Sequence, residues 1–249
     1  MICSATKVDF LSFEYPSLDW RARVPALDGD VHLWHGEPQQ HPDAIAQMAR
    51  VLSEDERSRM SRFRFQRDQN DFAFARAMLR NVLASYLGTD GKSVRFTYSE
   101  RGKPALAEPW TGSELRFNLS HTRGAVLLAV CAGREIGVDV EYVREDFEIE
   151  DIAGSFFSAG EREALMKIAS GRPRAEAFFR CWTRKEAWIK ARGDGLSFPL
   201  KSFDVSIAAE DDEVALVTRP RANEAQGWCI RNVPVARAYA AAAAVSRLV

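Results

Sequence analysis

Residues 135–141 read Glu-Ile-Gly-Val-Asp-Val-Glu, and this alternation of apolar and acidic residues decides the fold around them. Successive side chains of a β-strand point to opposite faces of its sheet. The isoleucine and the two valines therefore point into a core, whereas Gly137, Asp139 and Glu141 share the opposite face. The two carboxylates are expected about 7 Å apart at their Cα atoms. Gly137 is expected to leave room for a ligand beside them.

Two interpretations follow from this strand alone. Neighbouring carboxylates repel each other unless solvent, a basic group or a cation lies between them. The strand could therefore have an ordinary solvated polar face. It could instead form a site for Mg²⁺, which binds carboxylates together with phosphate oxygens and water. A third carboxylate nearby would favour the metal site.

Residues 175–192 supply a third carboxylate on a predicted amphipathic helix that Gly193 ends. Glu186 lies one turn after Trp182, and Lys190 lies one turn after Glu186. This spacing suits a surface ion pair worth about 0.2–0.5 kcal/mol. It also suits a carboxylate that acts as a general base beside a cation.

The remaining pattern predicts a mixture of helices and strands. Ser53 is a predicted N-cap, followed by acidic residues 54–56. Tyr239–Val245 is rich in alanine and favours a helix by propensity. A domain boundary is expected near Gly133, and no internal sequence repeat is evident. Further helices are predicted at 42–51, 68–87, 152–157 and 161–169, and further strands at 31–34, 94–98, 115–119, 125–131 and 136–143, with residues 120–124 as the connection after 119.

Composition limits the class of protein. The chain has 249 residues, 46% of them hydrophobic, and a net charge of −1, which argues against a generally basic binder of nucleic acid or membranes. Its four cysteines are widely spaced and suit a reducing compartment. The first 13 residues lack the features of a secretory signal, and no apolar run reaches the roughly 20 residues that span a bilayer. A cytoplasmic protein without a membrane segment is expected.

Three ordered blocks resemble the 4′-phosphopantetheinyl transferase superfamily, in particular its larger Sfp-type members. The turn Arg101-Gly102-Lys103-Pro104 also matches, and the resemblance covers roughly residues 52–203. The blocks are Phe117-Asn118-Leu119-Ser120-His121-Thr122; Ile136-Gly137-Val138-Asp139-Val140-Glu141; and Phe156-Phe157-Ser158 with Glu161, then Trp182-Thr183-Arg184-Lys185-Glu186-Ala187-Trp188-Ile189-Lys190 and Gly195-Leu196-Ser197.

The resemblance implies a fold, a reaction and partners. The fold is α+β, a pseudo-twofold arrangement of two similar α/β halves, here residues 1–133 with coenzyme A nucleotide contacts and residues 134–249 with the Mg²⁺ site and the catalytic helix. The reaction moves the 4′-phosphopantetheine arm of coenzyme A to a serine of an apo acyl or peptidyl carrier protein and releases 3′,5′-ADP. It requires Mg²⁺, for which Mn²⁺ could substitute in an all-oxygen site. A monomer is expected, and residues 239–245 are expected to form a strand despite their alanine content.

The same resemblance assigns roles to individual residues. Asp139, Glu141 and Glu186 match the carboxylates that hold Mg²⁺, and Asp139, Glu186 and Lys190 are the catalytic candidates. Glu186 also matches a proposed general base for the carrier serine, a role that competes with metal binding. Lys190 would stabilise the leaving group or the transferred phosphate, and Lys185 is a further candidate for phosphate contact.

Coenzyme A contacts are also carried over from the resemblance. His121 matches a histidine that contacts the 3′-phosphate, Ser120 would contact the pyrophosphate, and Lys103 would line the adenine and phosphate pocket. Basic 3′-phosphate contacts are expected among the arginines of residues 57–67 and the following helix, with Arg59 and Arg76 chosen. Glu56 departs from the pattern because some members are basic there. The arginines of 57–67 could equally form a solvated helix face.

Competing functions fit the sequence less well. Residues 88–93 resemble a phosphate-binding loop, but Tyr86 stands where that motif needs glycine. A zinc site at His32 and His35 fails because residues three apart on a strand point to opposite faces. Nucleic-acid binding through residues 57–67 and a non-catalytic coenzyme A binder remain as alternatives.

Overall fold

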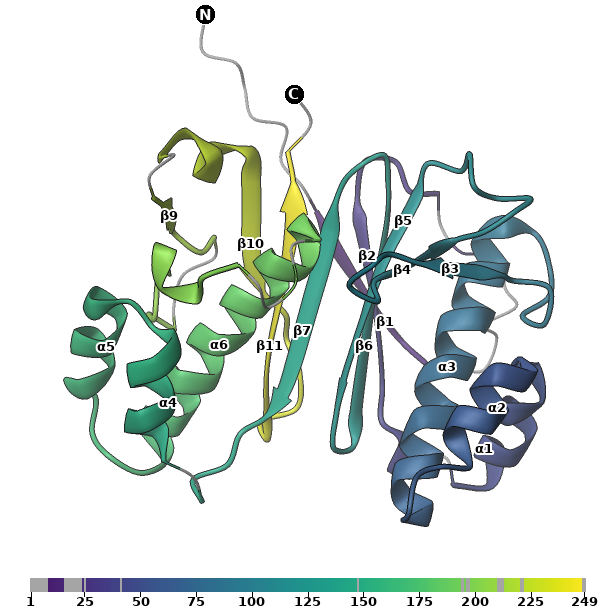
Figure 1. Ribbon diagram of the computed structural model, residues 1–249, viewed down its shortest axis with the longest axis horizontal. Helices are drawn as coiled ribbons and strands as arrows, with labels where there is room; N and C mark the ends of the chain where they lie inside the picture. Colours follow the sequence, from purple (N-terminus) through teal and green to yellow (C-terminus); the bar gives the residue numbers. More distant parts are fainter. Residues whose placement is uncertain are drawn as a thin grey trace, which may run out of the picture.

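A computed structural model of the chain describes residues 9–15, 24, 26–40, 42–146, 148–193, 195, 198–209, 213–219 and 222–247 (Figure 1). Leu196 and Ser197, which were named above, and Cys3, one of the four cysteines, lie outside these residues. Cys131, Cys181 and Cys229 are buried free thiols. None of the helices in the described ranges has the length and apolar character needed to span a bilayer.

The first half begins with two strands, continues with a group of helices and ends with two antiparallel hairpins. Helix α2 starts with the predicted cap, in which the Ser53 hydroxyl accepts from Glu56 N and the Glu56 carboxylate accepts from Ser53 N. Gly88, in the left-handed conformation, ends α3 as predicted. The elements are β1 (Phe10–Glu14), β2 (Val31–Gly36), η1 (Pro38–Gln40), α1 (Pro42–Met48), η2 (Ala49–Val51), α2 (Glu54–Met60), α3 (Gln66–Leu87), β3 (Phe96–Tyr98), β4 (Pro104–Leu106), β5 (Leu115–Thr122) and β6 (Ala125–Ala132).

The second half repeats this plan. A second capping box, formed by Ser158 and Glu161, starts α5, and Gly193 ends α6 in the left-handed conformation. The elements are β7 (Ile136–Tyr142), α4 (Ile149–Phe156), α5 (Ala159–Met166), α6 (Arg172–Arg192), η4 (Leu200–Ser202), β8 (Phe203–Val205), β9 (Leu216–Thr218), η5 (Ala222–Gly227), β10 (Trp228–Asn232) and β11 (Tyr239–Ser246).

Strand order shows that the two halves share a topology. In the second sheet, β7 pairs with β11 and β11 with β10, all antiparallel. In the first sheet, β2 pairs with β6 and β6 with β5 in the same way, and β1 is added in parallel to the free edge of β2. The chain therefore has the predicted α+β fold of two similar halves, although no sequence repeat revealed it.

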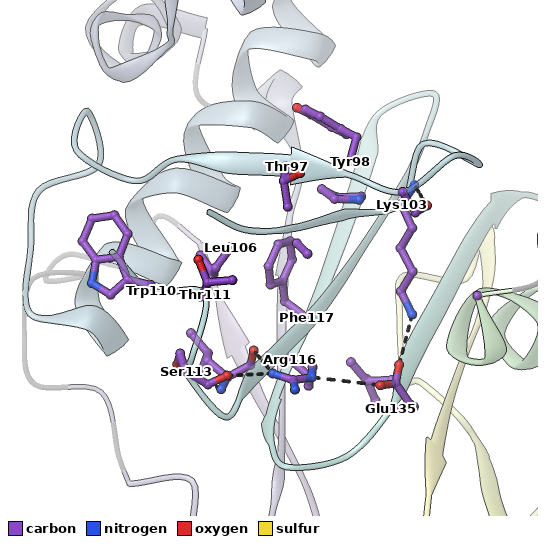
Figure 2. A pocket seen from close by; sticks show the side chains of 16 residues that line it. Thr97, Tyr98, Lys103, Leu106, Trp110, Thr111, Ser113, Arg116, Phe117 and Glu135 are labelled. Carbon is purple, nitrogen blue, oxygen red and sulfur yellow. Dashed lines mark hydrogen bonds and ion pairs between the residues drawn. The ribbon is translucent and has the colours of Figure 1, made fainter. Parts of the chain in front are cut away.

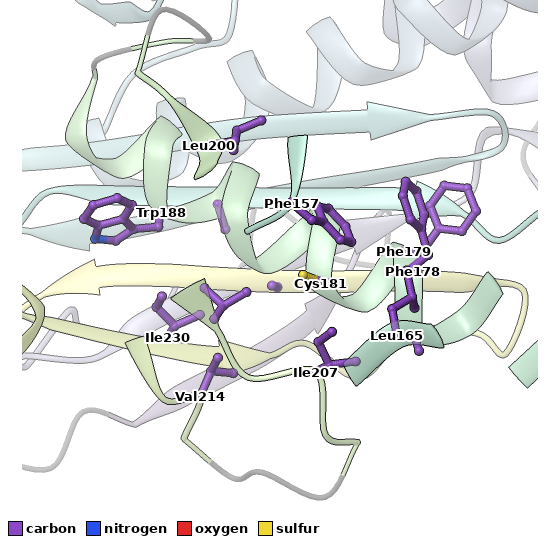
Figure 3. Close-up of a cluster of buried hydrophobic side chains, with 14 of the residues drawn as sticks. Phe157, Leu165, Phe178, Phe179, Cys181, Trp188, Leu200, Ile207, Val214 and Ile230 are labelled. Atoms are coloured by element: carbon purple, nitrogen blue, oxygen red, sulfur yellow. The ribbon is translucent and has the colours of Figure 1, made fainter. Parts of the chain in front are cut away.

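The sheets pack face to face, with the long helices on the outside (Figure 1). One core lies between the sheets and includes Leu33, Leu127, Val138, Val140 and Ala243. A second core lies between the first sheet and α3. A third joins the second sheet to α6, where Trp188, Phe178 and Phe157 are buried (Figure 3). Ile136, Val138 and Val140 point inward, as the alternation predicts.

Strand β7 is joined to the first half by side chains. Its Val138, Val140 and Tyr142 amides donate to Asn118 Oδ1, Ser120 Oγ and Thr122 Oγ1, at 2.9, 3.4 and 3.4 Å. Alternate residues of β5 thus take the place of a neighbouring strand along the free edge of β7. This junction joins the two halves and fixes the register between them.

Two sequence predictions are wrong, and for a third segment the structure decides between a helix and a strand. Residues 120–122, predicted as a connection, continue β5 because they pair with β6 as far as Thr122. Gly137 leaves no room for a ligand, because a Cβ there would overlap Ala187 O and Ala191 N of α6. Its lack of a side chain lets the helix pack on the strand. Tyr239–Ser246 is a strand, because pairing on both edges outweighs alanine's helix propensity.

Candidate active site

Three acidic side chains meet where α6 crosses β7. Asp139 and Glu141 lie on the face of β7 that carries Gly137, and the close contact of Gly137 with α6 places Glu186 beside them. Asp139 and Glu186 are buried, and Glu141 is half-buried. Each of the two glutamates has its ionisation affected by Asp139. The structure thus brings together the three carboxylates that the sequence singled out.

Lys190 and Ser120 complete this group from opposite halves of the molecule. The Lys190 ammonium donates to Asp139 Oδ1 at 2.6 Å and to Ser120 Oγ at 3.0 Å. The Ser120 hydroxyl donates in turn to Asp139 Oδ1 at 2.9 Å. Among the contacts of the described residues, the Lys190 ammonium thus pairs with Asp139, whereas the helical spacing had suited an ion pair with Glu186.

Thr122 was not singled out from the sequence, yet its hydroxyl donates to Glu141 Oε2 at 3.2 Å. It occupies the same face of β5 as Ser120, and both hydroxyls also accept from β7 amides. The period-two spacing of Ser120 and Thr122 was a usable signal. It was missed because residues 120–122 were predicted to lie in a connection.

The carboxyl groups of Glu141 and Glu186 have raised pKa values. Burial first, and then the charge of Asp139, raise the pKa of Glu186 to about 7, although Lys190 opposes the shift. Burial and Asp139 also raise the pKa of Glu141. Asp139 Oδ2 and Glu186 Oε1 are buried acceptors that receive no hydrogen bond from any described residue. Such a site would gain from a bound cation.

The carboxylate donor set fits a hard divalent cation, but the side chains are not yet arranged around one. Asp139 and Glu186 offer unpaired buried oxygens, and carboxylate oxygens are the ligands that Mg²⁺ prefers. Within the described ranges, no three His, Cys, Asp or Glu side chains are placed to hold a metal as they stand. A cation would therefore have to draw Asp139, Glu141 and Glu186 together.

A cationic region lies beside this group on the outer face of β5. The His121 side chain is exposed there. Its pKa is lowered first by the loss of hydration next to the protein and then by the positive charges of Lys190, Arg59 and Arg76. Arg59 lies over the ring of Phe72, with its guanidinium carbon 5.6 Å from the ring centre. The structure therefore places His121 within electrostatic reach of both Arg59 and Arg76.

Arg76, chosen above as a 3′-phosphate contact, already has partners within the protein. Its Nε donates to Glu56 Oε1 at 2.7 Å and its Nη2 to the Tyr98 hydroxyl at 3.2 Å. Arg80 Nε donates to the other oxygen of Glu56 at 2.6 Å. Arg80 was missed because sequence spacing alone cannot show that an arginine 24 positions away reaches a helix cap.

Lys103 lines a cavity of about 470 Å³ between the β3–β4 hairpin and the start of β5 (Figure 2). Its ammonium donates to Ala191 O at 3.2 Å and lies 3.5 Å from Glu135 Oε2. Leu106, Trp110 and Phe117 give the cavity an apolar wall. The Lys103 side chain therefore reaches from the first half of the chain to two groups of the second half.

Lys185 is not part of the site. Its side chain is fully buried, with Nζ 2.6 Å from Glu161 Oε1 and 2.7 Å from Phe203 O. Its ammonium also lies 4.1 Å from the centre of the Phe203 ring. The predicted phosphate contact is corrected to a structural ion pair that joins α6 to the cap of α5.

Comparisons with known proteins agree with this architecture. A family model described as 4′-phosphopantetheinyl transferase superfamily matches residues 135–244, and one described as 4′-phosphopantetheinyl transferase, N-terminal, matches residues 34–133. The 4′-phosphopantetheinyl transferase HetI of Nostoc is 38% identical over 205 residues, which cover 81% of this chain and 85% of HetI. Sfp of Bacillus subtilis is 29% identical over 165 residues, covering 66% and 70%.

Solved structures provide a weaker likeness. The crystal structure of Thermotoga maritima holo-[acyl-carrier-protein] synthase matches with a TM-score of 0.35 and 19% identity, covering 45% of this chain and 62% of the synthase. The sequence relatives span most of both chains, and the two family models divide this chain between them. The chain therefore belongs to the 4′-phosphopantetheinyl transferase superfamily and is of Sfp type.

Proposed function

We propose that this chain transfers 4′-phosphopantetheine from coenzyme A to a serine of an apo acyl or peptidyl carrier protein, in a Mg²⁺-dependent reaction that releases 3′,5′-ADP. The observation that carries the proposal is the group of Asp139, Glu141 and Glu186 beside Lys190 and Ser120, at the junction of the two halves. The family to which the chain belongs supplies the reaction class.

Asp139, Glu141 and Glu186 would hold the metal. The unpaired buried oxygens of Asp139 and Glu186 and the raised pKa values of the two glutamates are the features that a divalent cation would relieve. When bound, Mg²⁺ would supply charge neutralisation to the pyrophosphate of coenzyme A, and Mn²⁺ could serve in the same oxygen-rich set.

In the proposed reaction, residues of the chain would take up the proton of the carrier serine and stabilise the charge that develops on the phosphate. The carrier serine oxygen attacks the phosphorus next to the pantetheine, a new P–O bond forms, and the bond to the leaving 3′,5′-ADP oxygen breaks. Glu186 could accept the serine proton, directly or through water, only when it does not hold the cation, because a carboxylate bound to Mg²⁺ is a poor base; metal binding is the role that we propose for it. Lys190, held at Asp139 and Ser120, would stabilise charge on the phosphate or on the leaving group.

The other predicted contacts divide coenzyme A among three regions. His121, Arg59 and Arg76 form the cationic region proposed for the 3′-phosphate. Ser120 lies beside the carboxylates, where the pyrophosphate would be. The cavity at Lys103 falls within the range of roughly 300–1,000 Å³ usual for small-molecule sites and would receive the nucleoside. In this arrangement residues 1–133 contact the nucleotide and residues 134–249 carry the metal site and the catalytic helix.

The proposal is tested by intact-mass spectrometry of several apo carrier proteins after incubation with this chain, coenzyme A and Mg²⁺. The expected result is a mass gain of one phosphopantetheine arm that disappears with EDTA and returns with added Mg²⁺. Release of 3′,5′-ADP in equal amount would identify the leaving group. If no carrier gains mass while coenzyme A binds, the transfer proposal fails for those carriers. If coenzyme A does not bind, the site assignment fails as well.

A further inference from the structure

Glu56 is a buried carboxylate shared between two arginines. Its Oε1 accepts from Arg76, and its Oε2 accepts from Arg80 and from the amide of Ser53 at 2.9 Å. A buried carboxylate is costly unless its charge and its lone pairs are matched, and both conditions are met here. Glu56 therefore holds the start of α2, through Ser53, and α3, through the arginines, in one fixed arrangement.

The second half contains an equivalent carboxylate, and the comparison separates two roles. Glu161 is the capping-box glutamate of α5 and pairs with Lys185 of α6, 24 residues later. Glu56 is the capping-box glutamate of α2 and pairs with Arg80 of α3, also 24 residues later. Joining the cap to the long helix is thus a role common to both halves. Arg76, one turn before Arg80, is the addition found in the first half.

Arg76 differs from Arg80 in the exposure and the hydrogen-bond partners of its guanidinium. The Arg80 side chain is 5% exposed, and its Nη1 donates to Gly91 O and Val94 O. The Arg76 side chain is 12% exposed, and its Nη2 reaches the exposed Tyr98. Among the described residues, no hydrogen bond uses Arg76 Nη1. One donor edge is therefore held by Glu56 while another remains for a ligand.

We propose that Glu56 is a positioning residue for Arg76, and that it thereby sets the preference for a donor carrying a 3′-phosphate monoester over the same donor without it. The inference rests on the proposed function, because it takes Arg76 as a 3′-phosphate contact. A guanidinium held on one edge keeps its remaining donors in a fixed plane, which favours a tetrahedral oxyanion. Without Glu56, Arg76 would have several orientations and the preference would fall.

The test compares coenzyme A with 3′-dephospho-coenzyme A as donors for the wild type, Glu56→Gln and the matched control Glu161→Gln. Both substitutions remove the charge of a buried capping-box glutamate, so both should lower the melting temperature. Glu56→Gln should raise the KM for coenzyme A by about 10-fold, the scale of one charge-assisted hydrogen bond, and lower the ratio of the two kcat/KM values accordingly. Glu161→Gln should keep the wild-type ratio.

Glu56→Asp guards against a failure of Glu56→Gln to fold. It keeps the charge but shortens the reach to Arg76, and it should lower the same ratio. An unchanged ratio in either Glu56 variant, or an equal fall in the Glu161 control, overturns the positioning role. Absence of transfer by the wild type would instead refute the proposed function. Equal use of both donors by the wild type would remove Arg76 from the 3′-phosphate site and overturn the inference with it.

Discussion

Lys190 Nζ lies 2.6 Å from Asp139 Oδ1, so helix α6 is tied to strand β7 through a carboxylate that we propose as a metal ligand. The Asp139 side chain is almost fully buried, whereas that of Lys190 is partly exposed. The lysine can therefore leave the carboxylate for a substrate phosphate without becoming a buried, unpaired charge. This relationship makes Asp139 the first residue to test.

Asp139→Asn should lower turnover by at least about 100-fold, the usual scale for removing a group that stabilises the transition state. The amide keeps the size of the side chain and can still accept from Lys190, so the fold should survive. Turnover is measured by carrier-protein mass, and folding by circular dichroism. Asp43→Asn, at an exposed position of α1, serves as the control. Near-normal turnover in Asp139→Asn would exclude Asp139 from the metal site.

The raised pKa of Glu186 predicts how the metal-free protein responds to pH. Burial and Asp139 raise this pKa from 4.5 to about 7. Between these values the unfolded chain has lost a proton that the folded chain keeps, so the free energy of unfolding falls as pH rises. The loss from this group is on the order of 3 kcal/mol once pH exceeds the folded value.

A cation binds the ionised carboxylates, so Mg²⁺ should raise the melting temperature more at about pH 8 than at about pH 5. Glu186→Gln should reduce this difference, whereas Glu163→Gln, at an exposed ion pair, should keep it. Melting curves with and without Mg²⁺ provide the measurement. Equal Mg²⁺ shifts at both pH values in the wild type would argue against a cation at Glu186.

His121→Ala should raise the KM for coenzyme A by about 10-fold and leave kcat largely unchanged. Loss of hydration and the positive charges of Lys190, Arg59 and Arg76 lower the pKa of the imidazole. A bound phosphate, which is negative, would counter these charges and favour the protonated ring. Steady-state kinetics with varied coenzyme A gives both constants. An unchanged KM would remove His121 from the coenzyme A site.

Gly137→Ala should reduce both stability and turnover. Its Cβ would overlap the Ala187 carbonyl and the Ala191 backbone, so α6 would have to move away from β7 and carry Glu186 and Lys190 with it. A backbone clash of this kind costs about 1–3 kcal/mol or more. Gly154→Ala in α4 meets no atom within 4 Å and should stabilise the protein by about 0.5–1 kcal/mol. Urea unfolding gives the stability of both variants. Wild-type stability and turnover in Gly137→Ala would contradict the proposed close contact between Gly137 and α6.

The buried His32 predicts a loss of stability in acid. Its Nδ1 lies 2.7 Å from the Tyr86 hydroxyl, its Nε2 has no hydrogen-bond partner in the described part of the chain, and burial lowers its pKa below 6.5. The stability that this neutral ring contributes is present above pH 6.5 and is lost as pH falls, because the unfolded chain then binds the proton more readily.

His32→Asn should therefore lose less stability than the wild type between about pH 7.5 and about pH 5.5. His35→Asn, on the same strand, should retain the wild-type loss. Urea unfolding at the two pH values is the measurement. If wild type and His32→Asn respond equally to acid, the titration of His32 does not contribute.

Local signals in the sequence were sufficient for most helices. Ser53 and Gly88 mark the ends of their helices because caps act through neighbouring residues. The alternation at Asp139 and Glu141 also predicted which side chains share a face. The arrangement of helix and strand around Gly137 was not predictable, because the close contact comes from residues about fifty positions away.

Resemblance supplied the candidate site, but pairing within the fold decided which candidates meet. Lys185 and Lys190 lie five residues apart on one helix, and only the structure shows that Lys185 pairs with Glu161 in a core while Lys190 reaches Asp139. Likewise, Glu56 appeared as a departure from a basic pattern. In the fold it is the shared counter-ion of Arg76 and Arg80.

The parallel pairing of β1 with β2 affects how many active centres one chain can form. Because the halves repeat, β2 corresponds to β7, and each strand has one edge that its antiparallel neighbour, β6 or β11, does not use. At β7 that edge faces the hydroxyls of Ser120 and Thr122 and adjoins the carboxylates. At β2 the edge is filled by the backbone of β1. We therefore expect one transfer centre per chain, at β7, because β1 occupies the corresponding edge at β2.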